Sequence, residues 1–177
     1  MNRSLNQILM LVLVLLVPLM SFAHDVEIDE IFYNLDNDKK EATVTYKGCC
    51  SDNEDYTRFV VIPSSVQYNG VRYTVTAIGD GAFNNCVRLR SVTIPNTVTS
   101  LGEKAFAKCN GLTSFTIPNS VTSIGKKAFY LCTDITSMEI SNSVQSIGSH
   151  AFFGCSSLTS ITIPYSVTCI ADSTFSY

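Results

Sequence analysis

The amino-acid sequence predicts a repeat solenoid, which is a β-rich stack of 23-residue coils. An N-terminal β-hairpin cap is expected before the first coil. Three observations support this fold class. A 23-residue phrase occurs three times in succession over residues 91–159, apolar residues return at fixed places in it, and each copy holds a single apolar set. A copy of this size cannot bury its apolar side chains alone, so a neighbouring copy must supply the missing wall. Repetition therefore builds the hydrophobic core.

The repeat keeps its register along the second half of the chain. Glycine returns at positions 102, 125 and 148, where the last copy has Ala171. The other recurring slots hold Ile94, Ile117, Ile140 and Ile163; Val98, Val121, Val144 and Val167; Phe106, Phe129, Phe152 and Phe175; and Cys109, Cys132 and Cys155. An earlier copy begins near Phe59 and fits once nine residues after Gln67 are set aside. We therefore expect the solenoid at residues 57–177, as four repeats and a clipped fifth.

Each coil is expected to contain two short parallel strands and one short helical or 3-10 turn. In "SFTIP", Phe115 and Ile117 alternate with Ser114 and Thr116, so the first pair faces the core and the second faces solvent. Pro118 ends this strand because it has no N–H group to donate. The stretch "VTSIG" predicts a second extended piece, and "KKAFYLC" has the apolar spacing of about one helical or 3-10 turn.

Residues 24–56 are expected to form an N-terminal β-hairpin cap and a loop. Apolar and polar residues alternate over residues 31–35 and again over residues 42–46, with an Asp-Asn-Asp turn cluster between them. This pattern is typical of a β-hairpin. Because the end of a solenoid exposes one side of its core, a hairpin before the first coil is well placed to cover it.

The nine extra residues, 68–76, predict a hairpin insertion in the first coil. They contain Asn69-Gly70, the strongest short hairpin signal, between alternating apolar residues. We expect a β-ribbon that projects from the coil and exposes Tyr68, Arg72 and Tyr73. These residue types are favoured at interfaces, but aromatic cross-strand pairs also stabilise a ribbon that binds nothing. The ribbon is therefore a secondary candidate site.

Residues 1–23 have the pattern of a secretory signal peptide. Arg3 gives a positive start, residues 8–19 form an apolar run interrupted only by Pro18, and Ser21-Phe22-Ala23 is a small-x-small motif with cleavage expected after Ala23. The alternative, an uncleaved anchor, would need roughly 20 apolar residues, which this run does not reach. The expected location is secreted or at the cell surface, with retention in the periplasm left open.

The seven cysteines admit two interpretations in an exported protein. Cys86, Cys109, Cys132 and Cys155 stack at about the strand spacing of 4.8 Å, within nominal reach of disulfides. We favour buried free thiols, because these cysteines hold an inward slot where the residue acts as a small hydrophobe. Cys49 and Cys50 lie in a polar loop and pair with each other, pair elsewhere or stay free. Cys169 takes a slot where other coils have serine, so it is a candidate for an intermolecular bridge.

Composition and motifs argue against catalysis, metals and nucleic acid. The two histidines are His24, at the expected mature terminus, and His150, at a variable surface slot, and neither is spaced beside a nucleophile. No zinc spacing, phosphate loop or paired carboxylate motif is present, and the acidic loops lack the ligand ladder of an EF-hand. Without Arg3, 11 basic residues remain against 15 acidic ones, with no basic block. We expect no enzyme and no cofactor, and no membrane span in the mature chain.

The recurring motifs I-P-x-x-V, I-G-x-x-A-F and the following cysteine resemble the bacterial surface, BspA-like leucine-rich repeat proteins. The resemblance covers residues 57–177, and "EIDEIFYNLDNDKKEATVTY" is similar to the segment that usually precedes the repeats. It implies a solenoid of leucine-rich-repeat type in a secreted or surface-displayed binding protein. For some members it also implies adhesion to host or neighbouring-cell proteins.

Two functional hypotheses follow, besides an enzyme, which the missing constellation of reactive groups disfavours. The first is protein–protein binding or adhesion through an exposed sheet face, with a host or neighbouring-cell surface or matrix protein as ligand. The candidate residues are Ser91, Thr93, Ser114, Thr116, Ser137, Glu139, Ser160 and Thr162. The alternative is a structural or assembly element that self-associates end to end as a homo-oligomer. It rests on the last coil, whose strand around residues 161–163 is expected to have an open edge unless the natural chain continues beyond Tyr177 into further repeats.

Overall fold

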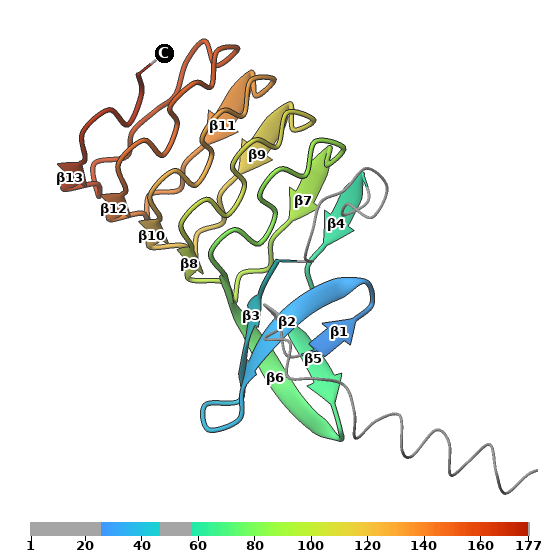
Figure 1. Cartoon of the computed structure of the whole chain (residues 1–177). Coiled ribbons are helices and arrows are strands. Elements are labelled where there is room, and N and C mark those ends of the chain that lie inside the picture. The colour runs from blue at the N-terminus through green and yellow to red at the C-terminus, as the bar shows by residue number, and fades with distance from the viewer. Residues whose placement is uncertain (1–25, 47–57, 177) are drawn as a thin grey trace, which may run out of the picture.

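The computed structural model describes residues 26–46 and 58–176. Within them, short strands run in two rows along a stack of coils, and a group of longer strands stands at one end of the stack (Figure 1). The predicted signal peptide, His24 and the loop with Cys49 and Cys50 lie outside the described residues, so the sequence alone supports those predictions.

One row of strands forms a surface that we call the hydroxyl face, because most of its outward side chains are serine or threonine. Its strands are β4 (Phe59–Val61), β7 (Ser91–Thr93), β9 (Ser114–Thr116) and β11 (Ser137–Glu139). β4 pairs in parallel with β7, and β9 pairs in parallel with β11. A parallel bridge from Met138 to Ile161 continues the row into the last coil. Strands from successive coils therefore lie side by side, as the repeat predicts.

The other row we call the glycine wall, because four of its strands end directly before a glycine. It consists of the end of β6 (Val71–Ile78), then β8 (Ser100–Leu101), β10 (Ser123–Ile124), β12 (Ser146–Ile147) and β13 (Cys169–Ile170), paired in parallel in this order. A Cβ atom added to Gly125 would lie 2.5 Å from the carbonyl carbon of Gly102 in the preceding coil. The coils approach too closely here for a side chain, which explains the repeated glycine.

The last coil, where Ala171 replaces this glycine, is held less closely. The hydrogen bond from the His150 N–H to the Asp172 carbonyl measures 3.4 Å, whereas the matching bond one coil earlier, from Lys127 to Ser149, measures 2.9 Å. The methyl group of Ala171 gives a steric reason, since the same slot in the earlier coils has no room for a Cβ atom. The departure of Ala171 from the glycine pattern thus marks a looser contact.

A stack of phenylalanine rings fills the core between the two rows. It consists of Phe83, Phe106, Phe129, Phe152 and Phe175, with neighbouring ring centroids 5.1–5.6 Å apart and interplanar angles of 3–11°. Phe115 meets Phe106 and Phe129 edge-on, at 4.9 and 4.8 Å. Near-parallel rings at this spacing and edge-on contacts are both favoured aromatic geometries. The aromatic slot of the repeat therefore becomes one continuous column through the coils.

The segment between the glycine and cysteine slots is a series of tight turns, so the predicted helical or 3-10 turn is wrong. In residues 58–176 the chain forms no helix. Lys104 and Lys108 have positive φ values of 54° and 59°. The Phe106 N–H donates to the Ala128 carbonyl of the next coil at 2.8 Å, whereas the Ala107 N–H donates within its own coil, to Lys104, at 3.1 Å. A helix would direct every N–H along its own axis and leave the neighbouring coil without these bonds.

The strands before the first coil extend the glycine wall. β1 (Val26–Ile28) pairs with β2 (Ile31–Asp36), and β2 pairs with β3 (Glu41–Val44), both antiparallel, so the predicted pairing of residues 31–35 with residues 42–46 is present. The Asp36 carboxylate accepts hydrogen bonds of 3.0 Å from the Lys39 and Asp38 amides, the first of which contributes most to lowering the pKa of Asp36. Tyr33 and Val44 are fully buried. The hairpin therefore packs against the core, as a cap would.

The inserted ribbon is present, but it does not project freely as predicted. β5 (Ser65–Tyr68) pairs antiparallel with β6, and the turn residues Asn69 and Gly70 have φ values of 49° and 78°. β6 also pairs in parallel with β3, and its last residues, Ala77 and Ile78, pair with β8. One strand thus joins the ribbon, the N-terminal hairpin and the solenoid, because it is long enough to pair with different partners along its length.

The four repeat cysteines form a ladder of buried thiols without disulfide bridges, as predicted. Cys86, Cys109, Cys132 and Cys155 are unbridged and at most 1% exposed. The Cys132 thiol donates to the Phe106 carbonyl, with Sγ and O 3.0 Å apart, and Cys155 does the same to Phe129 at 3.2 Å. Burial raises the pKa of Cys155 to about 11 and also raises the pKa of Cys132. Cys169, by contrast, is exposed.

We expect iodoacetamide at about pH 8 to alkylate Cys169 and to leave Cys132 and Cys155 unmodified until the protein unfolds, because only the thiolate reacts and burial disfavours it. Peptide mass spectrometry measures the modification of each site. Because folding raises the pKa values of Cys132 and Cys155, their contribution to the free energy of unfolding is fully present below about pH 8.5. It declines as the pH rises toward 11. Alkylation of the ladder as fast as of Cys169 in the native protein would contradict its burial.

Candidate functional site

All eight side chains predicted for the sheet face are exposed on the hydroxyl face. They are Ser91, Thr93, Ser114, Thr116, Ser137, Glu139, Ser160 and Thr162. Between them the strands bury their alternate side chains, as Phe115 shows at 5% exposure between two exposed neighbours. A strand turns successive side chains to opposite sides, so the outward ones from four coils form one row. Their exposure agrees with the sequence, while their role in binding stays a prediction.

The first coil departs from the hydroxyl pattern, which the sequence analysis did not single out. In β4, Phe59 and Val61 hold the places that Ser91 and Thr93 hold in β7, and they pair with those residues in register. Their side chains are 69% and 70% exposed. A comparison of the copies slot by slot would have found them, because every later copy has Ser, Thr or Glu at these positions.

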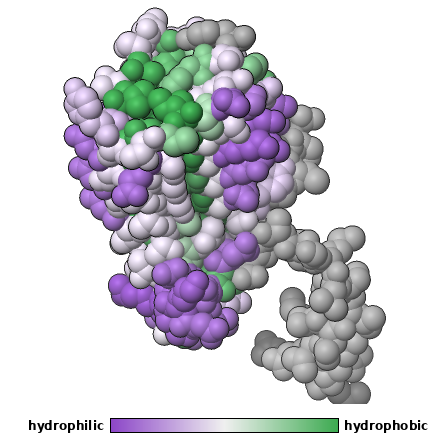
Figure 2. All heavy atoms as spheres, turned by 90° about the vertical axis from the view of Figure 1, so that its left-hand side faces the viewer, coloured by the Kyte–Doolittle hydropathy of each residue, from purple (hydrophilic) through white to green (hydrophobic). Residues whose placement is uncertain are grey.

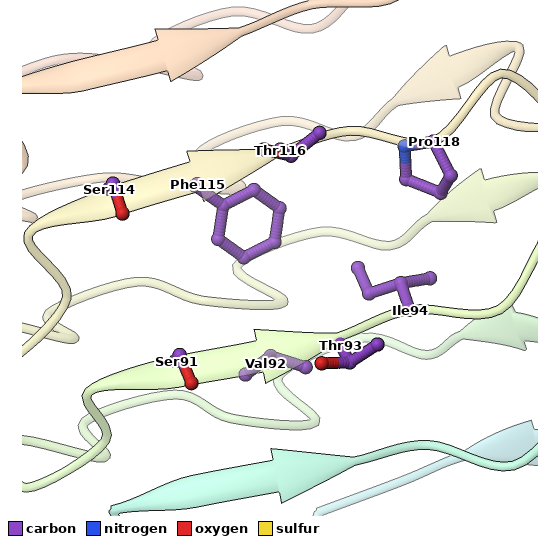
Figure 3. A pocket seen from close by; sticks show the side chains of 8 residues that line it. All are labelled: Ser91, Val92, Thr93, Ile94, Ser114, Phe115, Thr116 and Pro118. Carbon is purple, nitrogen blue, oxygen red and sulfur yellow. The ribbon is translucent and has the colours of Figure 1, made fainter.

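The hydroxyl face is interrupted between β7 and β9. The structure describes both strands in full and pairs β7 with β4 and β9 with β11, but it does not pair β7 with β9. A pocket of about 330 Å³, which we call the slot, lies at this interruption (Figure 3). It is lined by Ser91, Val92, Thr93, Ile94, Ser114, Phe115, Thr116 and Pro118. Hydroxyl groups therefore surround an apolar floor.

The inward side chains of β7 and of the residue after it are less buried than those of the next coil, and they line the slot. Val92 and Ile94 are only partly buried, whereas Phe115 and Ile117, which hold the matching places one coil later, are 5% and 2% exposed. In the repeat, Ile94 holds the same inward position as the later isoleucines, but the structure buries Ile94 less than Ile117. Apolar surface that the later coils hide is thus accessible here.

Two arginines lie at the amino ends of β4 and β7. Arg58 and Arg90 directly precede these strands, and both are exposed. The Arg90 N–H donates to the Arg58 carbonyl at 2.7 Å, so the two residues are neighbours across the sheet. The Arg90 guanidinium also donates to the Gly111 carbonyl at 3.1 Å, which holds it toward the segment that leads into β9. No salt bridge joins either arginine to another described residue.

The ribbon offers less surface than predicted. Tyr68 is 40% exposed and Arg72 is exposed, but Tyr73 is only 3% exposed, so the prediction of an exposed Tyr73 is wrong. The Tyr73 hydroxyl donates to Asn37 Oδ1 at 2.5 Å, in the turn between β2 and β3. The side chain is buried because the N-terminal hairpin packs on the ribbon, a contact between segments that are distant in the sequence.

His150 has no arrangement around it that indicates catalysis. Its ring is partly buried and lies 5.6 Å from the Phe153 ring, and among the described residues its buried Nδ1 atom has no hydrogen-bond partner. In the part of the chain that the structure describes, no three His, Cys, Asp or Glu side chains gather where they could hold a metal ion. Over the same residues, no helix reaches the length and apolar character needed to cross a bilayer.

Parallel strands stacked coil upon coil over an apolar ladder define a solenoid of leucine-rich-repeat type. The chain belongs to the BspA-type leucine-rich repeat family, because the model described as "BspA type Leucine rich repeat region" matches residues 58–177 in six copies. The 23-residue register divides the same part of the chain into four copies and a clipped fifth. A search of curated proteins finds no match.

Three solved structures resemble this chain closely enough to support the fold. A leucine-rich repeat protein from Bacteroides ovatus is 37% identical with a TM-score of 0.76, over 86% of this chain and 38% of its own. A leucine rich cell surface protein from Faecalibacterium prausnitzii is 35% identical with a TM-score of 0.72, over 85% and 39%. The leucine-rich repeat protein of T. pallidum is 28% identical with a TM-score of 0.73, over 86% and 66%.

This chain spans 38% of the length of the B. ovatus protein, 39% of the F. prausnitzii protein and 66% of the T. pallidum protein. Their similarity therefore supports the repeat fold and the family. Neither the family nor these neighbours indicates an enzyme.

Proposed function

We propose that this protein is a secreted or cell-surface binding protein that holds a protein ligand on its hydroxyl face. The observation that carries the proposal is the row of eight exposed side chains that four consecutive coils present on one side of the solenoid. Solenoids bind through such extended surfaces, because a stack of rigid repeats positions many side chains at once. Leucine-rich repeat proteins commonly bind other proteins, and this chain belongs to that class.

The expected location and ligand follow from two further observations. One similar protein is described as a cell surface protein, and residues 1–23 have the pattern of a signal peptide. A ligand on the surface of a host or neighbouring cell, or in the extracellular matrix, fits this location. Adhesion is therefore the form of binding that we propose.

A double substitution on the hydroxyl face tests this function. A screen against extracellular matrix and cell-surface proteins first identifies a captured ligand. We then expect Thr116→Arg with Glu139→Arg to abolish capture while the fold is kept, because exposed strand positions tolerate substitution better than core positions. Binding is measured by surface plasmon resonance and folding by circular dichroism.

The matched control is Gln145→Arg with Asp172→Arg, which changes the charge equally at exposed positions outside the hydroxyl face. This variant should bind like the original protein. Undiminished capture by the Thr116 and Glu139 variant would move the site away from the hydroxyl face, with Tyr68 and Arg72 of the ribbon as the next candidates.

A second candidate function, assembly through the last coil, has its own supporting observation. Ile163, Val167 and Phe175 are only partly buried there, and Ile170 is 49% exposed. Viewed toward the side where the last coils lie, the molecule shows apolar side chains gathered on its surface (Figure 2). We propose that this surface pairs with the same surface of a second copy, since open strand edges and apolar ends recruit other chains. Cys169 is placed to reinforce the pair.

Sedimentation velocity under reducing and non-reducing conditions tests this assembly. We expect a dimer at tens of micromolar in both conditions, which Ile170→Glu converts to a monomer because it places a charge in the apolar contact. Cys169→Ser should remove only the fraction that depends on non-reducing conditions. A strict monomer at these concentrations in both conditions would exclude the assembly.

A further inference from the structure

The slot between β7 and β9 has a cause in the sequence. The inward position of the strand is Val92 in β7 and Phe115 in β9, and edge-on contacts with two rings of the aromatic column fix Phe115 in place. Valine is smaller than the Phe, Met and Ile that later copies have at this position. Space therefore remains beside Val92, and no other side chain of the described residues covers Val92 and Ile94 fully.

The slot continues into further apolar surface on its other side. In β4, next to β7, Phe59 and Val61 point outward and are 69% and 70% exposed. The parallel register places them beside Ser91 and Thr93, which are on the rim of the slot. The slot and these two side chains lie on either side of Ser91 and Thr93 on the first coils of the hydroxyl face, and we call this apolar surface with its polar residues the strip. Apolar strips with polar rims mark sites of protein interaction.

Positive charge borders this strip. Arg58 and Arg90 lie at the amino ends of β4 and β7, and the bond from the Arg90 guanidinium to Gly111 holds that side chain near the segment that leads into β9. The chain as a whole has a net charge of −3, and Glu139, the acidic member of the predicted face, lies on β11 beyond the slot. Cations beside an apolar pocket complement a segment that combines an apolar side chain with a carboxylate.

We propose that the slot receives one large aromatic or aliphatic side chain from an extended, acidic segment of a protein ligand, and that Arg58 and Arg90 bind the neighbouring carboxylate. A volume of about 330 Å³ is enough for one such side chain and lies at the lower end of the range of ligand pockets. Interfaces concentrate their binding energy in buried apolar anchors and arginines. This inference rests on the proposed function and names the part of the hydroxyl face that anchors the ligand.

Selection of random dodecapeptides displayed on phage against the purified protein tests the proposal. Enriched peptides should carry Phe, Tyr, Trp, Leu or Ile within two positions of Asp or Glu. Val92→Phe fills the slot with the residue that the next copy has there, and it should weaken binding of the synthetic consensus peptide at least about tenfold. Met138→Phe makes the same kind of change in β11, where the structure has no slot against β9, and should leave affinity within about twofold.

Reversal of the charges is the second arm of the test. Arg58→Glu with Arg90→Glu should also weaken the consensus peptide at least about tenfold and should favour a peptide whose acidic residues are replaced by Lys. Both arginines are exposed, so this arm decides the question even where Val92→Phe does not fold. Binding is measured by fluorescence polarisation and folding by circular dichroism.

The proposal is overturned when no motif is enriched, when the enriched peptides lack the apolar or the acidic residue, or when folded Val92→Phe and the charge-reversed variant bind normally. Its failure can be told from failure of the proposed function. If Thr116→Arg with Glu139→Arg abolishes capture of the screened ligand but the slot and arginine variants retain it, the hydroxyl face binds without this anchor. If all of these variants retain capture, both proposals fail.

Discussion

The contact between successive coils is the constraint on which the rest of this structure depends. At the glycine wall the backbones approach so closely that Gly125 has no room for a Cβ atom. In the turned segment, alternate N–H groups bond to the next coil, and in the core the phenylalanine rings stack at 5.1–5.6 Å. Burial of a large apolar side chain contributes about 1.5–3 kcal/mol, against about 0.5–1.5 kcal/mol for a hydrogen bond. Each buried ring therefore contributes more stability than a single backbone bond, while the backbone bonds set the spacing of the coils.

Much of this architecture could be predicted, because it depends on local periodicity. The alternation around Phe115 predicted which side chains of the hydroxyl face point inward and which point outward. The 23-residue period predicted the aromatic column and the buried thiols. The turned segment was predicted wrongly because apolar spacing does not reveal positive φ at Lys104 and Lys108. Its amides bond to the neighbouring coil, and that partner is visible only in three dimensions.

The candidate site was predictable only in part, for a related reason. The exposed serines and threonines follow from strand alternation, but Tyr73 is buried, and its hydroxyl bonds to Asn37, a partner 36 residues earlier in the chain. The slot depends on how Val92 and Phe115 differ in size and on the missing pairing of β7 with β9. The face is consequently not uniform. Its first coils combine apolar surface with arginines, whereas its later coils present hydroxyl groups, so binding specificity is expected to reside mainly in the first coils.

Removal of one whole coil is the measurement that tests the dependence on coil contact most directly. Deletion of residues 118–140 removes one 23-residue period and joins Ile117 to Ser141, so that the remaining repeats stay in register. If stacking in register builds the fold, this shorter protein keeps the circular dichroism spectrum and a cooperative unfolding transition at lower stability. Deletion of residues 118–137, which removes 20 residues and breaks the register, should abolish that transition. Equal behaviour of the two deletions would show that the fold does not depend on the register of its coils.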